Sequence, residues 1–489
     1  MSGLLGIVLS LALLIWLAYR GVTVLVLGPL CALLAVLLAG APLLASYTQV
    51  FMPALGRFIV AFFPLFLLGA VFGKLMEDSG SARSIAQWLV GRLGDQRSIL
   101  AVVLACAMLT YGGVSLFVVA FAIYPIAAAL FRAAGTPKRL IPATIALGAF
   151  TFTMTALPGT PAIQNAIPMP YFGTTAFAAP GLGVLAGFIM FALGMLWLRR
   201  RELTARAAGE GYGKSTAPVE DTQAAPRTLR EHAAGEGFDL QEVGTTPSAA
   251  AQLSTLPSIV PAVAPVVAVI VLNYLFSAHL IPALDTRYLA RPEFGATHID
   301  ALRGVWSIIG ALVLSVLLIA ALNRRRIADL NLSIGAGANA SVMPIFNTAS
   351  QVGFGAVIAS LPAFALIRDA VLGLGDGNPL ISLSIAVNIL AGITGSASGG
   401  MSIALATLGP TYVEMANAAG ISMELMHRVT AIATGGLDAL PHNGAVITLL
   451  GICHLTHRES YWDIFIVAVV APIAALVAVV ALGTLVGSF

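Results

Sequence analysis

Residues 157–161 read LPGTP, and residues 440–444 read LPHNG. Upstream of each lies a second matched segment, GGVS at residues 112–115 and GGMS at residues 399–402. The offset between the two copies changes only from 287 residues (112 to 399) to 283 residues (158 to 441). The chain therefore contains an internal duplication whose apolar segments are interrupted by Gly and Pro, a pattern typical of the binding site of a transporter.

The composition indicates a membrane protein. Hydrophobic residues make up 58% of the 489 residues and charged residues only 10%, whereas a soluble globular chain carries roughly a quarter charged residues. Apolar runs long enough to cross a bilayer recur along the whole chain, for example at residues 178–198, 305–322 and 464–485. At about 20 residues per crossing, we expect an all-α polytopic membrane protein with roughly ten to twelve spans.

Basic residues border these apolar runs. The clusters Arg199–Arg201 and Arg324–Arg326 each close a run, and the positive-inside rule places them in the cytoplasm, with the N-terminus and residues 277–300 outside. The first apolar stretch has no basic n-region and no small-residue cleavage site, so we expect a retained helix rather than a signal peptide. Because the charges border spans and do not form one face, the pattern does not indicate nucleic-acid binding.

Three parts follow from this pattern. We predict an N-terminal membrane repeat (1–199), a polar cytoplasmic linker (200–255) and a C-terminal membrane repeat (256–489). We interpret the linker as a disordered tether, with a regulatory arm as the alternative. Three arginines lie in the amphipathic stretch 81–97, whereas its counterpart 362–378 has one arginine and two aspartates. This difference predicts that the two repeats are inverted in the membrane.

The Leu-Pro segments predict two broken helices. Thr160, followed by Pro161, and its counterpart Asn443 are residues that favour the N-cap of a restarting helix. The free amides at such a break need a wet or ligand-filled cavity, and a helix N-terminus favours an anion, above all a carboxylate. Gln164 and Asn165 add amide donors. The alternative is that each proline only kinks a packed span.

The Gly-Gly-x-Ser segments have the composition of re-entrant hairpin tips that meet the broken helices, although small residues also mediate ordinary helix contacts. Few ionisable residues lie deep in the apolar runs. Asp438 and His442 flank Pro441 in the second copy only, and we expect them to form a proton-responsive pair; in the alternative, Asp438 only bonds neighbouring backbone. Glu414 and His427 are expected to be solvated at a span end.

The run from Gly112-Gly113 through 158–168 (PGTPAIQNAIP), with Gly395-Ser396-Ala397, resembles the gluconate permease family of the ion transporter superfamily. The resemblance implies proton-coupled uptake of a small hydroxy-acid or sugar-acid carboxylate across the bacterial inner (cytoplasmic) membrane. It also implies a homodimer with a scaffold and an elevator-type transport domain, both built from inverted repeats. Because residues 437–443 depart from the pattern of the sugar-acid members, we expect a shorter acid such as a hydroxybutyrate.

Taken together, the resemblance and the broken segments predict one substrate site and one proton site. The substrate-binding residues expected are Gly112, Gly113, Ser115, Gly159, Thr160, Gln164, Asn165, Ser396, Ser398, Gly399, His442 and Asn443. Asp438 and His442 are expected to couple the proton. No cofactor and no metal are expected.

Two competing hypotheses remain. Ser396-Ala397-Ser398-Gly399 is close to the serine motif of rhomboid-type intramembrane proteases, so Ser398 with His442 as base would make a serine hydrolase. That hypothesis does not explain why the Gly-Gly-x-Ser and Leu-Pro segments are duplicated when the first copy has no histidine. The second competitor is an anion channel. A transporter that is not an enzyme accounts for both copies.

Overall fold

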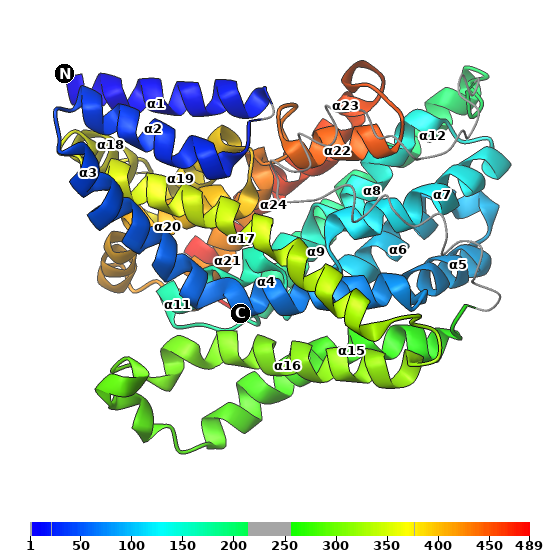
Figure 1. Cartoon of the computed structure of the whole chain (residues 1–489). Helices are drawn as coiled ribbons and strands as arrows, with labels where there is room; N and C mark the ends of the chain where they lie inside the picture. Colours follow the sequence, from blue (N-terminus) through cyan, green and yellow to red (C-terminus); the bar gives the residue numbers. More distant parts are fainter. Residues whose placement is uncertain (1, 21, 214–255, 376) are drawn as a thin grey trace.

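The computed structural model describes residues 2–20, 22–213, 256–375 and 377–489, and this part of the chain is helical with no β-strand (Figure 1). The first half consists of α1 (Ser2–Tyr19), α2 (Val24–Leu38), α3 (Leu43–Ala45), α4 (Met52–Asp78), α5 (Ser81–Leu93), α6 (Ser98–Tyr111), α7 (Leu116–Ala134), α8 (Ile141–Ala149), α9 (Phe152–Thr155), α10 (Ile163–Ala166), α11 (Pro168–Phe172) and α12 (Pro180–Ala207). The second half consists of α15 (Ile259–Leu275), α16 (Ile299–Asn323), α17 (Leu330–Ser360), α18 (Phe364–Leu372), α19 (Pro379–Thr394), α20 (Ala397–Ala418), α21 (Met423–Leu437), α22 (Gly444–Ile452), α23 (His457–Phe465) and α24 (Ala471–Val486).

Within the described ranges, seven helices are long and apolar enough to cross a membrane. Some of them include π-helical turns, which join α3 to α4, extend α15 and join α23 to α24. The seven spans are 43–78, 116–134, 180–207, 259–283, 299–323, 330–360 and 457–486. Four shorter apolar helices accompany them, at 3–17, 24–38, 98–111 and 379–394. The fold is that of a polytopic helical membrane protein, as the composition predicted.

The duplication is visible in the order of the elements. In each copy a long helix (α4 or α17) and a short one (α5 or α18) precede a helical hairpin, which is α6–α7 or α19–α20. The hairpin is followed by a helix that breaks at the Leu-Pro segment, between α9 and α10 or between α21 and α22. Matched sequence segments therefore occupy matched structural positions.

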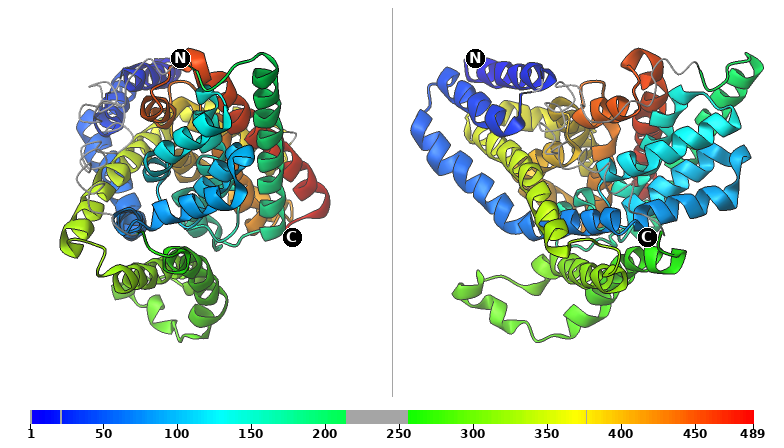
Figure 2. Two further views of the ribbon diagram at one scale, coloured as in Figure 1. Left: turned by 90° about the vertical axis from the view of Figure 1, so that its right-hand side faces the viewer. Right: turned by 45° about the vertical axis from the view of Figure 1, so that its right-hand side comes forward.

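The long helices α4 and α17 cross the molecule side by side, with the hairpins and broken helices on one flank (Figures 1 and 2). Their close approach depends on Gly337, because a Cβ at this position would lie 2.7 Å from the Val71 Cα. The α15–α16 hairpin forms a separate arm on another side of the molecule and contacts α4 and α5. The α4–α17 pair is thus placed to form one wall of any central site.

The first residues of the predicted linker (200–255) continue helix α12. Helix α12 continues to Ala207, through strong helix formers and an ion pair of 2.7 Å between Arg206 and Glu202 one turn apart. The remaining part of the predicted linker, residues 214–255, lies outside the described residues.

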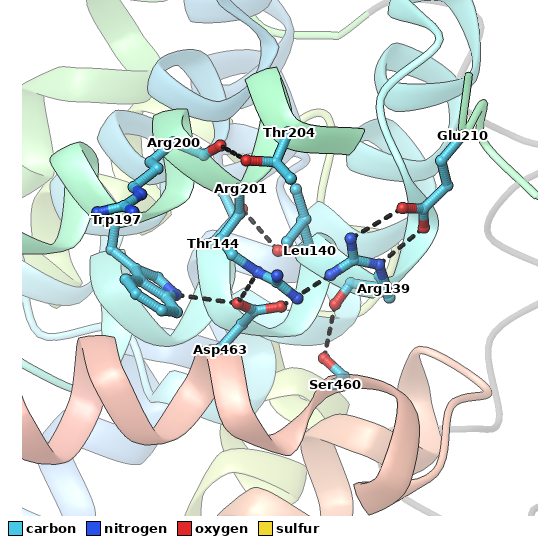
Figure 3. Close-up of polar contacts among 10 residues, drawn as sticks. All are labelled: Arg139, Leu140, Thr144, Trp197, Arg200, Arg201, Thr204, Glu210, Ser460 and Asp463. Carbon is cyan, nitrogen blue, oxygen red and sulfur yellow. Dashed lines mark hydrogen bonds and ion pairs between the residues drawn. The ribbon is translucent and has the colours of Figure 1, made fainter. Parts of the chain in front are cut away.

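A buried carboxylate joins the end of α12 to α23 (Figure 3). Asp463, whose side chain is 1% exposed, accepts from Arg139 Nη1 at 3.2 Å, Arg201 Nε at 2.8 Å and Trp197 Nε1 at 2.9 Å. Arg139 in turn forms two bonds to Glu210, at 2.7 and 2.9 Å. Because a buried charge is tolerated only when paired and hydrogen-bonded, this network fixes α23 against α12.

Candidate functional site

A cavity of about 300 Å³ lies where the two hairpin tips and the two broken helices meet α4 and α17. Its volume suits a small organic molecule. The first copy contributes Gly113, Val114 and Ser115 from its hairpin and Pro161, Ala162, Ile163 and Gln164 from its break; the second contributes Ser396, Ala397 and Ser398 from its hairpin and Asp438, Ala439, Asn443 and Ala445 from its break. Residues some 280 positions apart in the sequence therefore line one space.

In the first copy, the hairpin tip touches the break directly. Gly113 has a φ of +94°, and a Cβ at this position would lie 2.8 Å from Pro161 Cγ. The Tyr111 hydroxyl at the end of α6 donates to the Pro158 carbonyl at 2.6 Å. Glycine is needed at the tip because an L side chain is disfavoured at this φ and would clash with the proline.

In the second copy, Asn443 joins the break to the tip. Its Oδ1 accepts from the amides of Ala445 at 2.6 Å and Val446 at 3.3 Å, so Asn443 caps α22 as predicted. Its Nδ2 donates to the Gly395 carbonyl at 2.6 Å and also to the Asp438 carbonyl. One side chain therefore fixes the start of α22, the preceding turn and the hairpin tip.

Four helices begin at the cavity. The first turns of α7, α10, α20 and α22 all contribute lining residues. Two of these helices are long, with 19 residues in α7 and 22 in α20. The first amides of α22 are capped by Asn443, Gly399 N of α20 is capped by Ser396 Oγ at 3.2 Å, and α10 has only four residues. The partial positive charge at the starts of the two long helices, α7 and α20, still favours an anion in the cavity.

The prediction that Thr160 caps the restarted helix is wrong. Helix α10 begins at Ile163 after Ala162, which is extended at φ −55° and ψ 140°. The preceding carbonyls are bonded by one local and one tertiary donor, since Asn165 Nδ2 donates to the Thr160 carbonyl at 3.0 Å and Asn273 Nδ2 to the Gly159 carbonyl at 3.2 Å. With these partners the chain stays extended for two residues beyond Thr160 before the helix starts.

Several predicted site residues lie behind the cavity wall. Gly112 faces Val266 of α15, and Gly159 faces the ring of Phe177, each with 2.5 Å between a hypothetical Cβ and the neighbour. His442 Nε2 donates to the Gly392 carbonyl at 2.9 Å. Neither these residues nor Thr160, Asn165 and Gly399 line the cavity.

A buried arginine holds the first break in place. Arg428 of α21 is fully buried, and its guanidinium donates to the carbonyls of Ala156 at 3.0 Å and Ala178 at 2.8 and 3.0 Å. It also donates to the Ala176 carbonyl at 3.3 Å and to Asn165 Oδ1 at 3.2 Å. Among the described residues it forms no ion pair with a carboxylate, so it ties the start of the break at Ala156 and Asn165 of α10 to the loop before α12.

The neighbouring His427 was expected to be solvated, and this prediction is wrong. His427 is fully buried, with Nδ1 2.6 Å from Thr174 Oγ1 and Nε2 3.2 Å from Asn165 Oδ1. Asn165 therefore joins α21 to the broken segment, and it does not line the cavity. Glu414 is exposed, as expected.

The charged residues of the cavity are Asp438, Lys74 and Glu77. Lys74 lies 3.5 Å from Glu77 and 3.1 Å from Asp78, all on α4. Only Asp438 of the predicted proton pair faces the cavity, because the His442 ring turns to the backbone of α19. Lys74 and Glu77 were not predicted as site residues, although two charged residues three positions apart at the end of an apolar run could have indicated a functional site.

Sequence reasoning also missed the polar face of α17. Ser341, Asn347, Thr348 and Gln351 line the cavity, at a spacing that places them on one side of a helix. Thr348 Oγ1 lies 3.5 Å from Ser398 Oγ, which lies 3.4 Å from Ser396 Oγ. Four amide or hydroxyl side chains at helical spacing within an apolar helix were the available signal.

The geometry does not favour the hydrolase. Ser398 Oγ contacts Thr348 and Ser396, whereas the Nε2 of His442 is occupied by the Gly392 carbonyl. Within the described part of the chain no hydrogen bond joins the serine to the histidine. A serine nucleophile needs a base within hydrogen-bond reach.

Helices that break at matched positions around a central cavity define a multi-pass membrane transporter. No protein-family model matches the chain. The chain is 43% identical over 487 residues to the uncharacterized transporter YxjC of Bacillus subtilis (strain 168), and the match covers 98% of each protein. The chain belongs to the family of this transporter, which agrees with the prediction that it is not an enzyme.

A solved structure supports the fold. The YdaH transporter of Alcanivorax borkumensis superposes with a TM-score of 0.53 at 16% identity, covering 88% of this chain and 87% of that one. At this identity the similarity concerns the fold alone. The comparisons therefore establish a transporter family, without pointing to the gluconate permease family in particular.

Proposed function

We propose that the chain is a secondary active transporter that imports a small hydroxy-acid or sugar-acid carboxylate together with a proton. The observation that carries the proposal is the convergence of four helix starts on one cavity. Each start stabilises a nearby negative charge by about 0.3–1 kcal/mol at exposed sites and by up to about 2 kcal/mol when partly buried. Helix starts that converge on one cavity therefore favour a bound carboxylate over a neutral ligand.

Asp438 supports proton coupling. It lines the same cavity as the proposed carboxylate, and two carboxylates in a small space bind best when one of them carries a proton. Binding of the anion and binding of the proton then favour each other by the same free energy. Such linkage is what a symporter requires.

The remaining parts of the proposal rest on the gluconate permease resemblance and on packing. The hairpins and broken helices are tied together by Asn443, Arg428 and the Gly113–Pro161 contact, which suits a transport domain that moves as one elevator-type body. The long α4–α17 pair is suited to form the wall against which this transport domain slides. We also propose that the two repeats are inverted, that the protein forms a homodimer, and that it lies in a bacterial inner membrane.

Uptake into proteoliposomes tests this function. With an imposed gradient, alkaline inside, labelled (R)-3-hydroxybutyrate or D-gluconate is expected to accumulate above its equilibrium level and to leave when a protonophore is added. A channel would equilibrate the acid without this accumulation. If neither acid binds or enters, the proposed substrate class is wrong.

A variant pair tests the coupling residue. Asp438→Asn is expected to bind the acid but to lose uphill accumulation, whereas Asp369→Asn, which removes an exposed carboxylate paired with Arg368, keeps it. Uphill accumulation by Asp438→Asn that equals that of the wild type would exclude Asp438 from coupling.

A further inference from the structure

The proposed function leaves two charged side chains of the cavity without a role. Lys74 and Glu77 of α4 both line the cavity, and their side chains are 17% and 21% exposed. A ligand can therefore reach them without unpacking of the wall. Charged residues within a membrane span are costly and usually mark a substrate or ion pathway.

Lys74 has two carboxylate partners, which are held differently. Its Nζ lies 3.1 Å from Asp78 Oδ1 and 3.5 Å from Glu77 Oε2. Asp78 also accepts from Ser333 Oγ of α17 at 2.6 Å, and it does not line the cavity. Glu77 faces the cavity and makes the longer contact with Lys74. Glu77 is therefore the partner that an incoming anion can replace.

The start of α7 lies beside this ion pair. A Cβ on Gly73 would lie 3.7 Å from the Ser115 amide nitrogen, and Ser115 directly precedes α7. Gly73 and Ser115 both line the cavity, as Lys74 does. An anion at the start of α7 is thus near the stretch of α4 that carries Lys74. A full ammonium charge attracts it more strongly than a helix start, which carries about half a charge.

The surroundings of Glu77 make a bound anion unfavourable unless a proton is added. Lys74 and Asp78 on the same helix and Arg83 of α5 act on Glu77 through their charges. The residues of α7 and α17 that line the cavity are uncharged, and the charged residues of α16 lie in its first two turns. With a ligand bound, three carboxylates would share Lys74. A proton on Glu77 removes one of these like charges.

We propose that Lys74 is a substrate-binding cation that exchanges its ion pair with Glu77 for one with the ligand carboxylate, while Glu77 takes up a proton. The inference rests on the proposed function, since it adds a cation and a second proton-binding group to the same anion site. The Lys74–Glu77 pair is lost, a Lys74–ligand pair forms, and a proton from the solution neutralises the Glu77 carboxylate.

Substitutions of the two partners are expected to act in opposite directions. Calorimetric titration of the purified full-length protein uses (R)-3-hydroxybutyrate or D-gluconate, whichever binds the wild type more tightly. Lys74→Gln is expected to weaken binding about 10- to 100-fold, because the ligand loses a cation. Glu77→Gln is expected to strengthen binding about 10-fold, because it removes the competing carboxylate.

A structural ion pair would not produce opposite effects. Unchanged affinity in both variants, or weaker binding in both, overturns the exchange and leaves the carboxylate site standing. If neither acid binds the wild type, the proposed function fails and the exchange fails with it.

Proton uptake provides an independent measurement. Titrations in buffers that differ in ionisation enthalpy count the protons that the protein takes up when the acid binds. The wild type is expected to take up more protons than Glu77→Gln, because Glu77 is neutralised only when the ligand replaces it on Lys74. Equal proton uptake by the two proteins excludes Glu77 as the acceptor.

The matched controls are Lys138→Gln and Glu202→Gln, which lie outside the cavity. The Glu202 side chain is 13% exposed and pairs with Arg206 one turn along α12, much as Glu77 pairs with Lys74. Both controls are expected to keep the wild-type affinity, and Lys74→Arg is expected to keep most of it. If Lys74→Gln does not fold, the double variant Lys74→Gln/Glu77→Gln is compared with Glu77→Gln, and equal affinity excludes Lys74.

Discussion

Arg428 carries the first prediction, because its buried guanidinium joins the start of the first break, at Ala156, to the loop before α12, at Ala178. In Arg428→Met the aliphatic stem remains, but the carbonyls of Ala156 and Ala178 lose the side-chain donors that now lie 2.8 to 3.0 Å away. The Ala176 carbonyl keeps its bonds from Gly159 N at 2.8 Å and Asn165 Nδ2 at 3.0 Å.

The expected loss follows from these contacts. Two orphaned carbonyls cost roughly 2–6 kcal/mol. Removing a buried charge returns part of its desolvation penalty. A net destabilisation of about 3 kcal/mol therefore remains, and at about 2 °C per kcal/mol for a large domain the midpoint of thermal unfolding falls by about 6 °C.

The assay is thermal unfolding of the detergent-solubilised protein, followed by intrinsic fluorescence. Arg428→Lys keeps the charge with fewer donors and is expected to fall between wild type and Arg428→Met. Arg287→Met is the control, because the Arg287 side chain is 91% exposed and pairs only locally with Asp285. A midpoint for Arg428→Met as close to wild type as that of Arg287→Met would refute the reasoning.

Three further predictions concern the site and the surface network. Asn443→Asp keeps an oxygen that can cap α22 but places a negative charge beside the bound anion. At a separation of about 5 Å and an effective dielectric constant of about 20, the repulsion between the two charges is about 3 kcal/mol. Calorimetry is therefore expected to show a more than about 100-fold loss of carboxylate affinity, and an unchanged affinity would place the anion elsewhere. Gly399→Ala is expected to lower the midpoint of thermal unfolding, because the added Cβ would overlap the buried Gln351 carboxamide, and an unchanged midpoint would contradict this close packing. Arg139 holds the pKa of the Glu210 carboxyl below its usual range. The ion pair therefore stabilises the fold at neutral pH, and this stabilisation is lost as the pH falls below about 4. The unfolding midpoints of wild type and Glu210→Gln are expected to differ slightly at pH 7 and to converge on acidification, and a constant difference would contradict the role of the ion pair.

A matched control is available for the glycine variant. Gly335 lies on the exposed face of α17 with no atom within 4 Å of a hypothetical Cβ. Gly335→Ala is therefore expected to keep or slightly raise the midpoint of thermal unfolding, because alanine favours the helix over glycine.

The sequence predicted the site best where local chemistry decides the structure. Asn443 was predicted to be a cap because asparagine is favoured at the N-cap, where its side-chain oxygen accepts from the first amides of the helix. The structure shows that Asn443 caps α22. The hairpin tips were identified from small residues and duplication. Thr160 does not cap the helix because the chain stays extended to Ala162, in a segment whose carbonyls are bonded by Asn165 and by Asn273, which lies 114 residues from Gly159. Local propensity does not contain that information.

The supporting residues could not be located from spacing alone. Arg428 and His427 lie in a sequence that looks like a solvated helix start, yet both are fully buried against a segment about 250 residues away. Gln351 is one of several polar residues in α17, and its sequence position does not show that its carboxamide packs against Gly399 of α20. Such contacts depend on how the two copies pack together.

The central claim is that the cavity binds an anion at four helix starts, and a change of ligand charge tests it most directly. Isothermal titration of the purified protein compares (R)-3-hydroxybutyrate with (R)-3-hydroxybutyramide, which keeps the length and the hydroxyl but has no charge. We predict that the acid binds at least about 100-fold more tightly than the amide, because charge-assisted bonds to helix starts are lost in the neutral ligand. Equal affinity for the two ligands, or tighter binding of the amide, would contradict the account.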